Sequence, residues 1–163
     1  MQNDPESRSI SLERQINEGM VNSELSGKVA IVTGAGRMRG IGRATAMILA
    51  RMGSHVVVTG TGRNPDTFPN DEKDVGWRDI DSTVEEIQAN GVRGLPLVVD
   101  VSSEMDVRRM IDSTIEEFGR LDIMVNNAAA PYGPDRVPVL DLSSDVFKDV
   151  IDIKLMGTFY CSK

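Results

Sequence analysis

The stretch Thr33-Gly34-Ala35-Gly36-Arg37-Met38-Arg39-Gly40-Ile41-Gly42 decides how this chain folds. It follows a short apolar run over 29–33, which is typical of a strand buried on both faces. Apolar residues then recur at helical spacing over 41–52. Glycines at such a junction let the backbone turn sharply, and the unpaired N–H groups of the following helix favour an anion such as a pyrophosphate. The alternative is an ordinary glycine-rich turn, because Arg39 stands where a strict G-x-G-x-x-G would have its third glycine.

The same alternation of apolar runs and helical spacing continues along the chain. We expect further strands over 55–59, 95–99 and 121–125, and helices over 80–87, over 107–118 and from Ser143 or Ser144 to the end. Strands that alternate with helices predict an α/β fold, a Rossmann-like doubly wound parallel sheet with the spatial order 3-2-1-4. We expect this sheet to be truncated before a fifth strand. A ligand crevice is expected beside the first strand, where the winding reverses.

Two segments lie outside this regular pattern. Residues 1–25 are polar and mixed in charge, so we expect a flexible extension before a nucleotide-binding domain over 26–163. Residues 60–79 form a long polar stretch with two prolines, which predicts a loop. A loop of this length is either functional or a tolerated surface insertion, and the sequence leaves both alternatives open.

Composition excludes several classes of function. The net charge of -7 argues against binding of a nucleic-acid backbone, which needs clustered Lys and Arg. No run of about 18 apolar residues predicts a membrane span. One cysteine, Cys161, and one histidine, His55, supply neither a disulfide nor a zinc site. These features favour a cytoplasmic protein without a metal, and His55 is expected to be structural.

Three short motifs resemble those of the short-chain dehydrogenase/reductase family over about residues 25–163. That family has T-G-x-x-x-G-x-G after its first strand, and here Thr33-Gly34 and Gly40-Ile41-Gly42 match with two more residues between them. Asp100-Val101 is similar to the family's pair that contacts the adenine ring. Asn126-Asn127-Ala128-Ala129 is similar to N-N-A-G, with Ala129 in place of the glycine. Each motif follows an expected strand, at the sheet edge where ligands bind in open α/β folds.

The resemblance implies a nicotinamide cofactor and a set of residues that would hold it. The candidates are Gly34, Gly36, Arg37, Arg39, Gly40, Ile41, Gly42, Thr59, Arg63, Asp100, Val101, Asn127, Ala128 and Ala129. An acid at the end of the second strand usually binds the ribose of NAD, and here no acid precedes Asp66. Arg63, with Arg37 or Arg39 nearby, is suited to a 2′-phosphate, so we expect NADP in preference to NAD. Alternatively, Arg63 is a solvated loop residue, while Asp100 and Asn127 serve as turn residues.

The family's catalytic Ser, Tyr and Lys, the last two in Y-x-x-x-K, have no counterpart in these 163 residues. Tyr160 and Lys163 are one residue too close together, so we expect Tyr160 to be structural. Lys154 stands where the family has an Asn, on the same predicted helix stripe as Ile151 and Thr158. It is either an altered proton relay or a lysine whose stem packs while its amine reaches solvent. We therefore expect this chain alone to have no dehydrogenase activity.

The resemblance implies an NAD(P)(H)-dependent oxidoreductase that reduces carbonyls or oxidises alcohols, with a fold of perhaps ~250 residues when complete. A 3-oxoacyl carrier-protein reductase is one such activity. The expected partners are a small carbonyl or alcohol substrate and further copies of the complete enzyme. A non-catalytic nucleotide-binding module is the second hypothesis. Another Rossmann-like fold, such as a methyltransferase, is the third, and the Asn-Asn-Ala-Ala motif argues against it.

Overall fold

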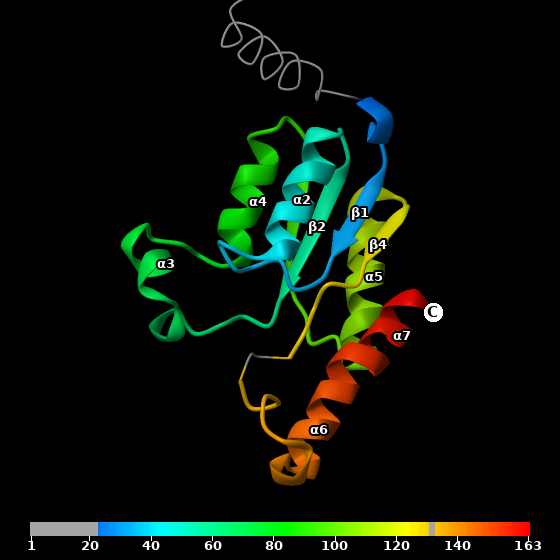
Figure 1. Ribbon diagram of the computed structural model, residues 1–163. Helices are drawn as coiled ribbons and strands as arrows, with labels where there is room; N and C mark the ends of the chain where they lie inside the picture. The colour runs from blue at the N-terminus through cyan, green and yellow to red at the C-terminus, as the bar shows by residue number, and fades with distance from the viewer. Residues whose placement is uncertain (1–22, 131–132) are drawn as a thin grey trace, which may run out of the picture.

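A parallel four-stranded sheet lies at the centre of the fold (Figure 1), with its strands side by side in the order β3-β2-β1-β4. The computed structural model describes residues 23–130 and 133–163, so most of the expected N-terminal extension lies outside the described residues. The strands are β1 (Val29–Val32), β2 (His55–Gly60), β3 (Gly94–Val98) and β4 (Ile123–Val125). The Rossmann-like α/β class and the 3-2-1-4 order predicted from the sequence are confirmed.

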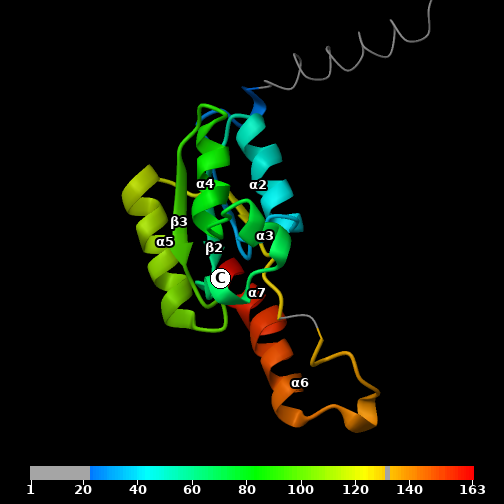
Figure 2. The same cartoon turned by 90° about the vertical axis from the view of Figure 1, so that its left-hand side faces the viewer.

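Helices cover both faces of this sheet (Figure 2). The helices α2 (Ile41–Arg51) and α4 (Ile80–Gln88) pack on one face, while α5 (Glu104–Phe118) and α7 (Gly157–Ser162) pack on the other. Adjacent residues of a strand point to opposite faces, so Val56 and Val58 join the first core while Val57 joins the second. The central strands β1 and β2 are mostly apolar because both of their faces are covered.

The last helix begins where the sequence predicts, but it is not uniform. Its first part, α6 (Ser144–Ile151), is capped by Ser143, whose Oγ accepts a hydrogen bond from the amide of Val146 at 3.3 Å. A π-helical turn, η4 (Asp152–Met156), then separates α6 from α7. Two 3₁₀ turns, η1 (Ser23–Leu25) and η3 (Val139–Asp141), lie elsewhere in the chain. Within the described residues, no helix is both long and apolar enough to cross a membrane.

The long stretch between β2 and α4 is more ordered than the sequence predicts. It contains a 3₁₀ turn, η2 (Pro65–Thr67), and a short helix, α3 (Asn70–Asp74). The expectation of a plain loop over 60–79 was therefore wrong in part. The sequence does not predict these two elements, because the segment contains two prolines and many charged residues. In addition, neither element is long enough to show an apolar stripe.

Asp122 joins the starts of β1 and β4 at the edge of the sheet opposite the glycine-rich turn. Its Oδ2 accepts hydrogen bonds from the amide of Val29 at 2.9 Å and from Nε of Arg120 at 2.8 Å, and its Oδ1 lies 3.3 Å from Nζ of Lys28. The hydrogen bonds from the Arg120 guanidinium, with those from Val29 and Lys28, hold the pKa of the Asp122 carboxyl well below its ordinary value. The ionised carboxylate therefore stabilises the folded state.

The pH dependence of this contribution can be measured. Because the pKa of Asp122 is lower in the folded chain than in the unfolded chain, the stabilisation is complete above about pH 4 and is lost as the pH falls below it. We expect Asp122→Asn to unfold at a lower urea concentration than the wild type at pH 7, and the gap between the two to narrow at about pH 3. A gap that stays constant over this range would contradict the assignment.

Candidate functional site

The turn between β1 and α2 lies at the carboxyl end of the sheet, where it meets the loop after β4. Gly34 has φ +71°, and a Cβ there would lie 2.9 Å from the Cα of Ala128. A Cβ on Gly42 would lie 2.5 Å from Nδ2 of Asn127 and 2.7 Å from the carbonyl oxygen of Gly34. Glycine at both positions therefore permits the two loops to approach each other.

Thr33 and Asn127 fasten these two loops together. Oγ1 of Thr33 accepts hydrogen bonds from the amides of Asn127 and Ala128, both at 3.0 Å. Nδ2 of Asn127 donates to the carbonyl oxygens of Thr33 at 2.8 Å and Gly34 at 3.0 Å. Asn127 thus has the turn role that the sequence analysis left open beside the binding role. Thr33 was not among the predicted site residues, although its place at the start of the family motif was a signal.

The N-terminus of α2 provides the chemistry of an anion site. Gly40 occupies the N-cap position and has no side chain to cap the helix, while its carbonyl accepts from the amide of Ala44 at 3.1 Å. The amides of Ile41, Gly42 and Arg43 have no hydrogen-bond partner in the parts of the chain that the structure describes. Unpaired amides together with the helix dipole suit a phosphate group, and the glycines leave a cradle that a Cβ would fill.

Thr59, at the end of β2, supports this turn from the other side. It is buried, its carbonyl accepts from the amide of Ala35 at 2.8 Å, and its Oγ1 accepts from the amide of Gly34 at 3.4 Å. Its side chain is therefore engaged with the turn. The predicted contact of Thr59 with a cofactor stays a prediction.

The three arginines that the sequence singled out have different surroundings. Arg37 is exposed and forms no ion pair with the residues described here, and Arg39 is paired with Asp71 at 3.0 Å. Arg63 is mostly buried and pairs with Glu72 at 3.0 Å and with Asp79 at 2.9 Å. Burial lowers the pKa of Arg63, but hydrogen bonds to Asp79 and Glu72 outweigh it and raise that pKa above its ordinary value. Arg63 is thus a paired residue, not the solvated loop residue of the alternative interpretation.

Asp100 and Val101 follow β3 and face different ways. Asp100 is exposed, and its Oδ1 accepts hydrogen bonds from the amide of Ser102 at 2.9 Å and from its hydroxyl at 2.6 Å. Val101 is buried against Gly157 of α7, where a Cβ would lie 2.9 Å from Cγ2 of Val101. Asp100 therefore has the turn role that the sequence left open, with its second carboxylate oxygen still able to accept.

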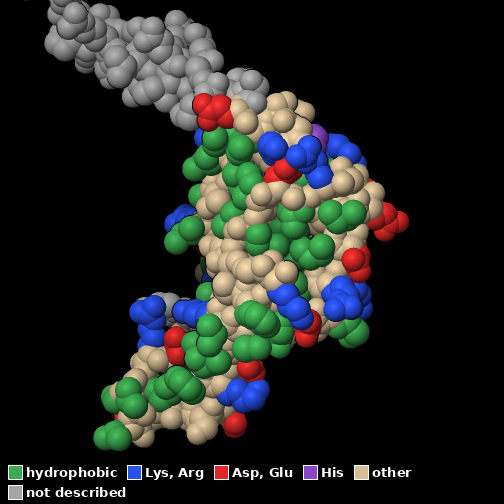
Figure 3. Space-filling model, turned by 90° about the vertical axis from the view of Figure 1, so that its right-hand side faces the viewer, with side chains coloured by type: hydrophobic (Ala, Val, Ile, Leu, Met, Phe, Trp, Pro, Cys, Tyr) green, Lys and Arg blue, Asp and Glu red, His purple; other side chains and the backbone are tan. Residues whose placement is uncertain are grey.

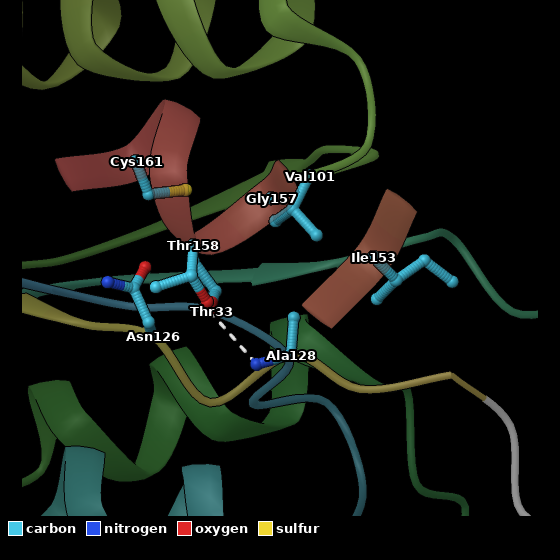
Figure 4. A pocket seen from close by; sticks show the side chains of 8 residues that line it. All are labelled: Thr33, Val101, Asn126, Ala128, Ile153, Gly157, Thr158 and Cys161. Carbon is cyan, nitrogen blue, oxygen red and sulfur yellow. Dashed lines mark hydrogen bonds between the residues drawn. The ribbon is translucent and has the colours of Figure 1, made fainter. Parts of the chain in front are cut away.

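A small hollow separates the turn from the last helix (Figure 4). It is lined by Thr33, Val101, Asn126, Ala128, Ile153, Gly157, Thr158 and Cys161. The hollow has no room for a water-sized sphere, so these residues form a wall where the turn and the last helix pack together and not a ligand pocket. Burial raises the pKa of the Cys161 thiol, which keeps this wall uncharged.

The remaining predicted residues lie away from this wall. Lys154 is exposed on the π-helical turn, which favours the interpretation in which its amine reaches solvent. Tyr160 packs against the core beside α5, as expected of a structural residue. His55, at the opposite end of β2, stacks on Phe118 with ring centres 5.6 Å apart. Tyr132, which the sequence places in the loop after β4 either at the mouth of a substrate site or as a plain loop residue, lies outside the described residues.

The fold and its glycine-bearing turn define a Rossmann-like domain with a candidate anion site at the sheet's carboxyl edge. Residues 28–163 match the model of the family described as short chain dehydrogenase. The chain belongs to the short-chain dehydrogenase family.

Comparisons with individual proteins agree with this assignment. The chain is 41% identical over 140 residues to the short chain dehydrogenase/reductase astE of Aspergillus oryzae, covering 85% of this chain and 47% of that protein. It is 34% identical over 139 residues to a 3-oxoacyl-[acyl-carrier-protein] reductase of Synechocystis, covering 85% and 49%. The crystal structure of an NAD⁺-bound xylitol dehydrogenase superimposes with a TM-score of 0.69 at 31% identity, covering 85% and 46%. The chain spans about half the length of the curated relatives it matches.

The bonds between Thr33 and the loop after β4 lead to a stability prediction. Thr33→Val keeps the shape of the side chain but leaves the amide of Ala128 without its acceptor, while the amide of Asn127 keeps its bond to the carbonyl oxygen of Val125 at 3.1 Å. We expect a loss of about 1–3 kcal/mol in the free energy of unfolding, the cost of one part-buried orphaned group. The control Thr33→Ser keeps the oxygen and is expected to lose less than half as much. Equal urea denaturation curves for Thr33→Val and wild type would contradict this role.

Proposed function

We propose that the protein carrying this chain is an NAD(P)(H)-dependent oxidoreductase that interconverts alcohols and carbonyls. The observation that carries the proposal is the N-terminus of α2, which no side chain caps and whose amides at Ile41 and Gly42 have no partner within the described part of the chain, beside the glycine-lined turn. Membership of the short-chain dehydrogenase family supports a nicotinamide cofactor. When bound, that cofactor would supply the hydride chemistry, while this chain would bind and orient it.

The residues near the turn would divide the work of binding. The amides of the turn and of the α2 N-terminus would hold the diphosphate. Asp100 and the main chain of Val101 would contact the adenine, as the family resemblance implies. The candidates after β4, which are Asn127, Ala128 and Ala129, would line the path toward the reacting end of the cofactor. Lys154 would stay in solvent, away from proton transfer.

The cofactor preference rests on the arginines beside the turn. Arg63 is already held by two carboxylates, which makes it a poor partner for a 2′-phosphate. Arg37 is exposed and forms no ion pair within residues 23–130 and 133–163, and the carboxylate nearest the end of β2, that of Asp79 beside Gly60, is already paired with Arg63. We therefore propose that NADP is preferred and that Arg37, and not Arg63, supplies the contact that distinguishes it from NAD.

The substrate class, location and assembly are also part of the proposal. A small carbonyl or alcohol, such as a 3-oxoacyl thioester, is the kind of substrate that the name of the Synechocystis relative suggests. We infer a cytoplasmic protein that forms homo-oligomers. Figure 3 shows one face of the molecule, with hydrophobic side chains at its surface. Along the last helix, the exposed hydrophobic residues include Phe147, Leu155 and Phe159.

The cofactor proposal predicts a selective effect of one substitution. We expect NADPH to bind more tightly than NADH, and Arg37→Ala to weaken NADPH binding by about tenfold or more while changing NADH binding less than about twofold. Cofactor fluorescence during titration gives both dissociation constants. Arg51→Ala is the matched control, because it removes an exposed arginine from the other end of α2. Equal affinity for the two cofactors would contradict the preference, and no binding of either would contradict the proposed function.

A further inference from the structure

The residues between β2 and α4 contact the turn that is proposed to hold the phosphate. Oε1 of Glu72, on α3, accepts a hydrogen bond from the amide of Met38 at 2.9 Å. Nε1 of Trp77 donates to the carbonyl oxygen of Gly36 at 2.7 Å. Nη2 of Arg63 donates to the same carbonyl at 3.3 Å. Three side chains from one segment thus bond main-chain atoms in the middle of the turn.

Burying the carboxylate of Glu72 at this position costs free energy, which indicates that the residue has a role there. It is only 3% exposed, and its second oxygen, Oε2, lies 3.0 Å from Nη1 of Arg63. A buried carboxylate is tolerated only when it is both paired and hydrogen-bonded. Arg63 supplies the ion pair, and the Met38 amide of the turn supplies the hydrogen bond. The position of Glu72 and the conformation of the turn therefore depend on each other.

Asp79 carries a second cost at the same place. Its backbone has φ 57° and ψ -128°, a conformation that residues other than glycine rarely adopt. Its carboxylate packs so closely on the turn that a Cβ on Gly36 would lie 1.7 Å from Oδ1, and its Oδ2 is buried without a hydrogen-bond partner among the residues that the structure describes. Such strain persists only where the surroundings determine the conformation strongly. Here the ion pair with Arg63 and the contact with Gly36 supply that constraint.

The turn itself explains why such a constraint is useful. Five residues separate Gly34 from Gly40, two more than in the family pattern. A longer turn has more conformations to lose when it closes around a ligand, so a turn held in shape beforehand binds more tightly. An insertion that only covered the surface would not need buried charges bonded to the main chain of the turn.

We propose that the segment 61–79 is a clamp that holds the lengthened phosphate turn in its binding conformation, with Glu72 and Trp77 as the positioning residues. The clamp rests on the proposed function, because it is the dinucleotide that the held turn would bind. Glu72 and Trp77 act through Met38 and Gly36 and do not themselves touch the cofactor.

The test compares two clamp variants with one control in the protein that carries this chain. Glu72→Gln removes the charge that pairs with Arg63, and Trp77→Phe keeps a ring while removing the N–H that bonds Gly36. Asp74→Asn makes the same acid-to-amide change on the exposed side of α3. Thermal unfolding identifies any variant that fails to fold. Trp77→Phe is the variant expected to disturb folding least, because it keeps an aromatic ring.

Two measurements separate positioning from simple structural support. NMR hydrogen exchange reports on the Met38 amide, and titrations give dissociation constants for NADPH and for adenosine, which lacks the diphosphate. We expect Trp77→Phe to weaken NADPH binding about 3–10-fold and Glu72→Gln about 10–100-fold, following the strength of neutral and charged hydrogen bonds. We expect faster exchange at Met38 in Glu72→Gln, unchanged adenosine binding in both variants, and wild-type behaviour in Asp74→Asn.

Each other outcome has a definite meaning. Wild-type protein that binds NADPH, together with clamp variants that bind it equally well, would overturn the clamp and leave the proposed function intact. Equal loss of NADPH and adenosine binding would also overturn it, because the segment would then support the whole domain. Failure of the wild type to bind any dinucleotide would overturn the proposed function itself, and the clamp with it.

Discussion

The space between the β1–α2 turn and the loop after β4 is so narrow that only glycine fits on the turn side. Gly34 lies against Ala128, and Gly42 lies against Asn127. This close approach allows the Thr33 hydroxyl to serve two amides of the opposite loop at once. It also fixes where α2 begins, and therefore where its unpaired amides point. The candidate site exists because these main chains meet without intervening side chains.

Of the three arginines that the sequence singles out near the turn, two form ion pairs with carboxylates of the described residues and one, Arg37, does not. Arg39 is paired with Asp71, and Arg63 is paired with Glu72 and Asp79. These pairs lie beside the turn, while Arg37 is exposed and forms no ion pair among the residues that the structure describes. The net charge of -7 therefore says little about the candidate site, because the anion binding proposed for it would come from main-chain amides and one local arginine.

Much of the fold could be predicted because its signals are local. Buried strands are predicted by the short apolar runs at 29–33 and 55–59. A sharp turn is predicted by the glycines at 34–42. The site was harder, because its contacts join distant residues. The sequence shows no partner for the charge of Arg63. Its partners, Glu72 and Asp79, come from a segment whose apolar residues follow no helical or strand spacing.

The last helix illustrates the limit of periodicity. The periodicity puts Lys154 on an apolar stripe with Ile151, but Leu155 and Phe159 of that stripe are exposed, and so is Lys154 on the π-helical turn at Asp152–Met156. Thr33 could be found from its motif, yet its bonds to residues 94 and 95 positions away come only from the folded sheet.

Amide chemical shifts during titration of the isotopically labelled protein with NADPH test the central claim most directly. The account predicts that the largest changes occur at Ile41, Gly42 and the neighbouring turn, since these amides would bond the diphosphate. Changes confined to a different surface, such as the groove between α2 and α4 that Met47 and Asn90 line, would contradict it.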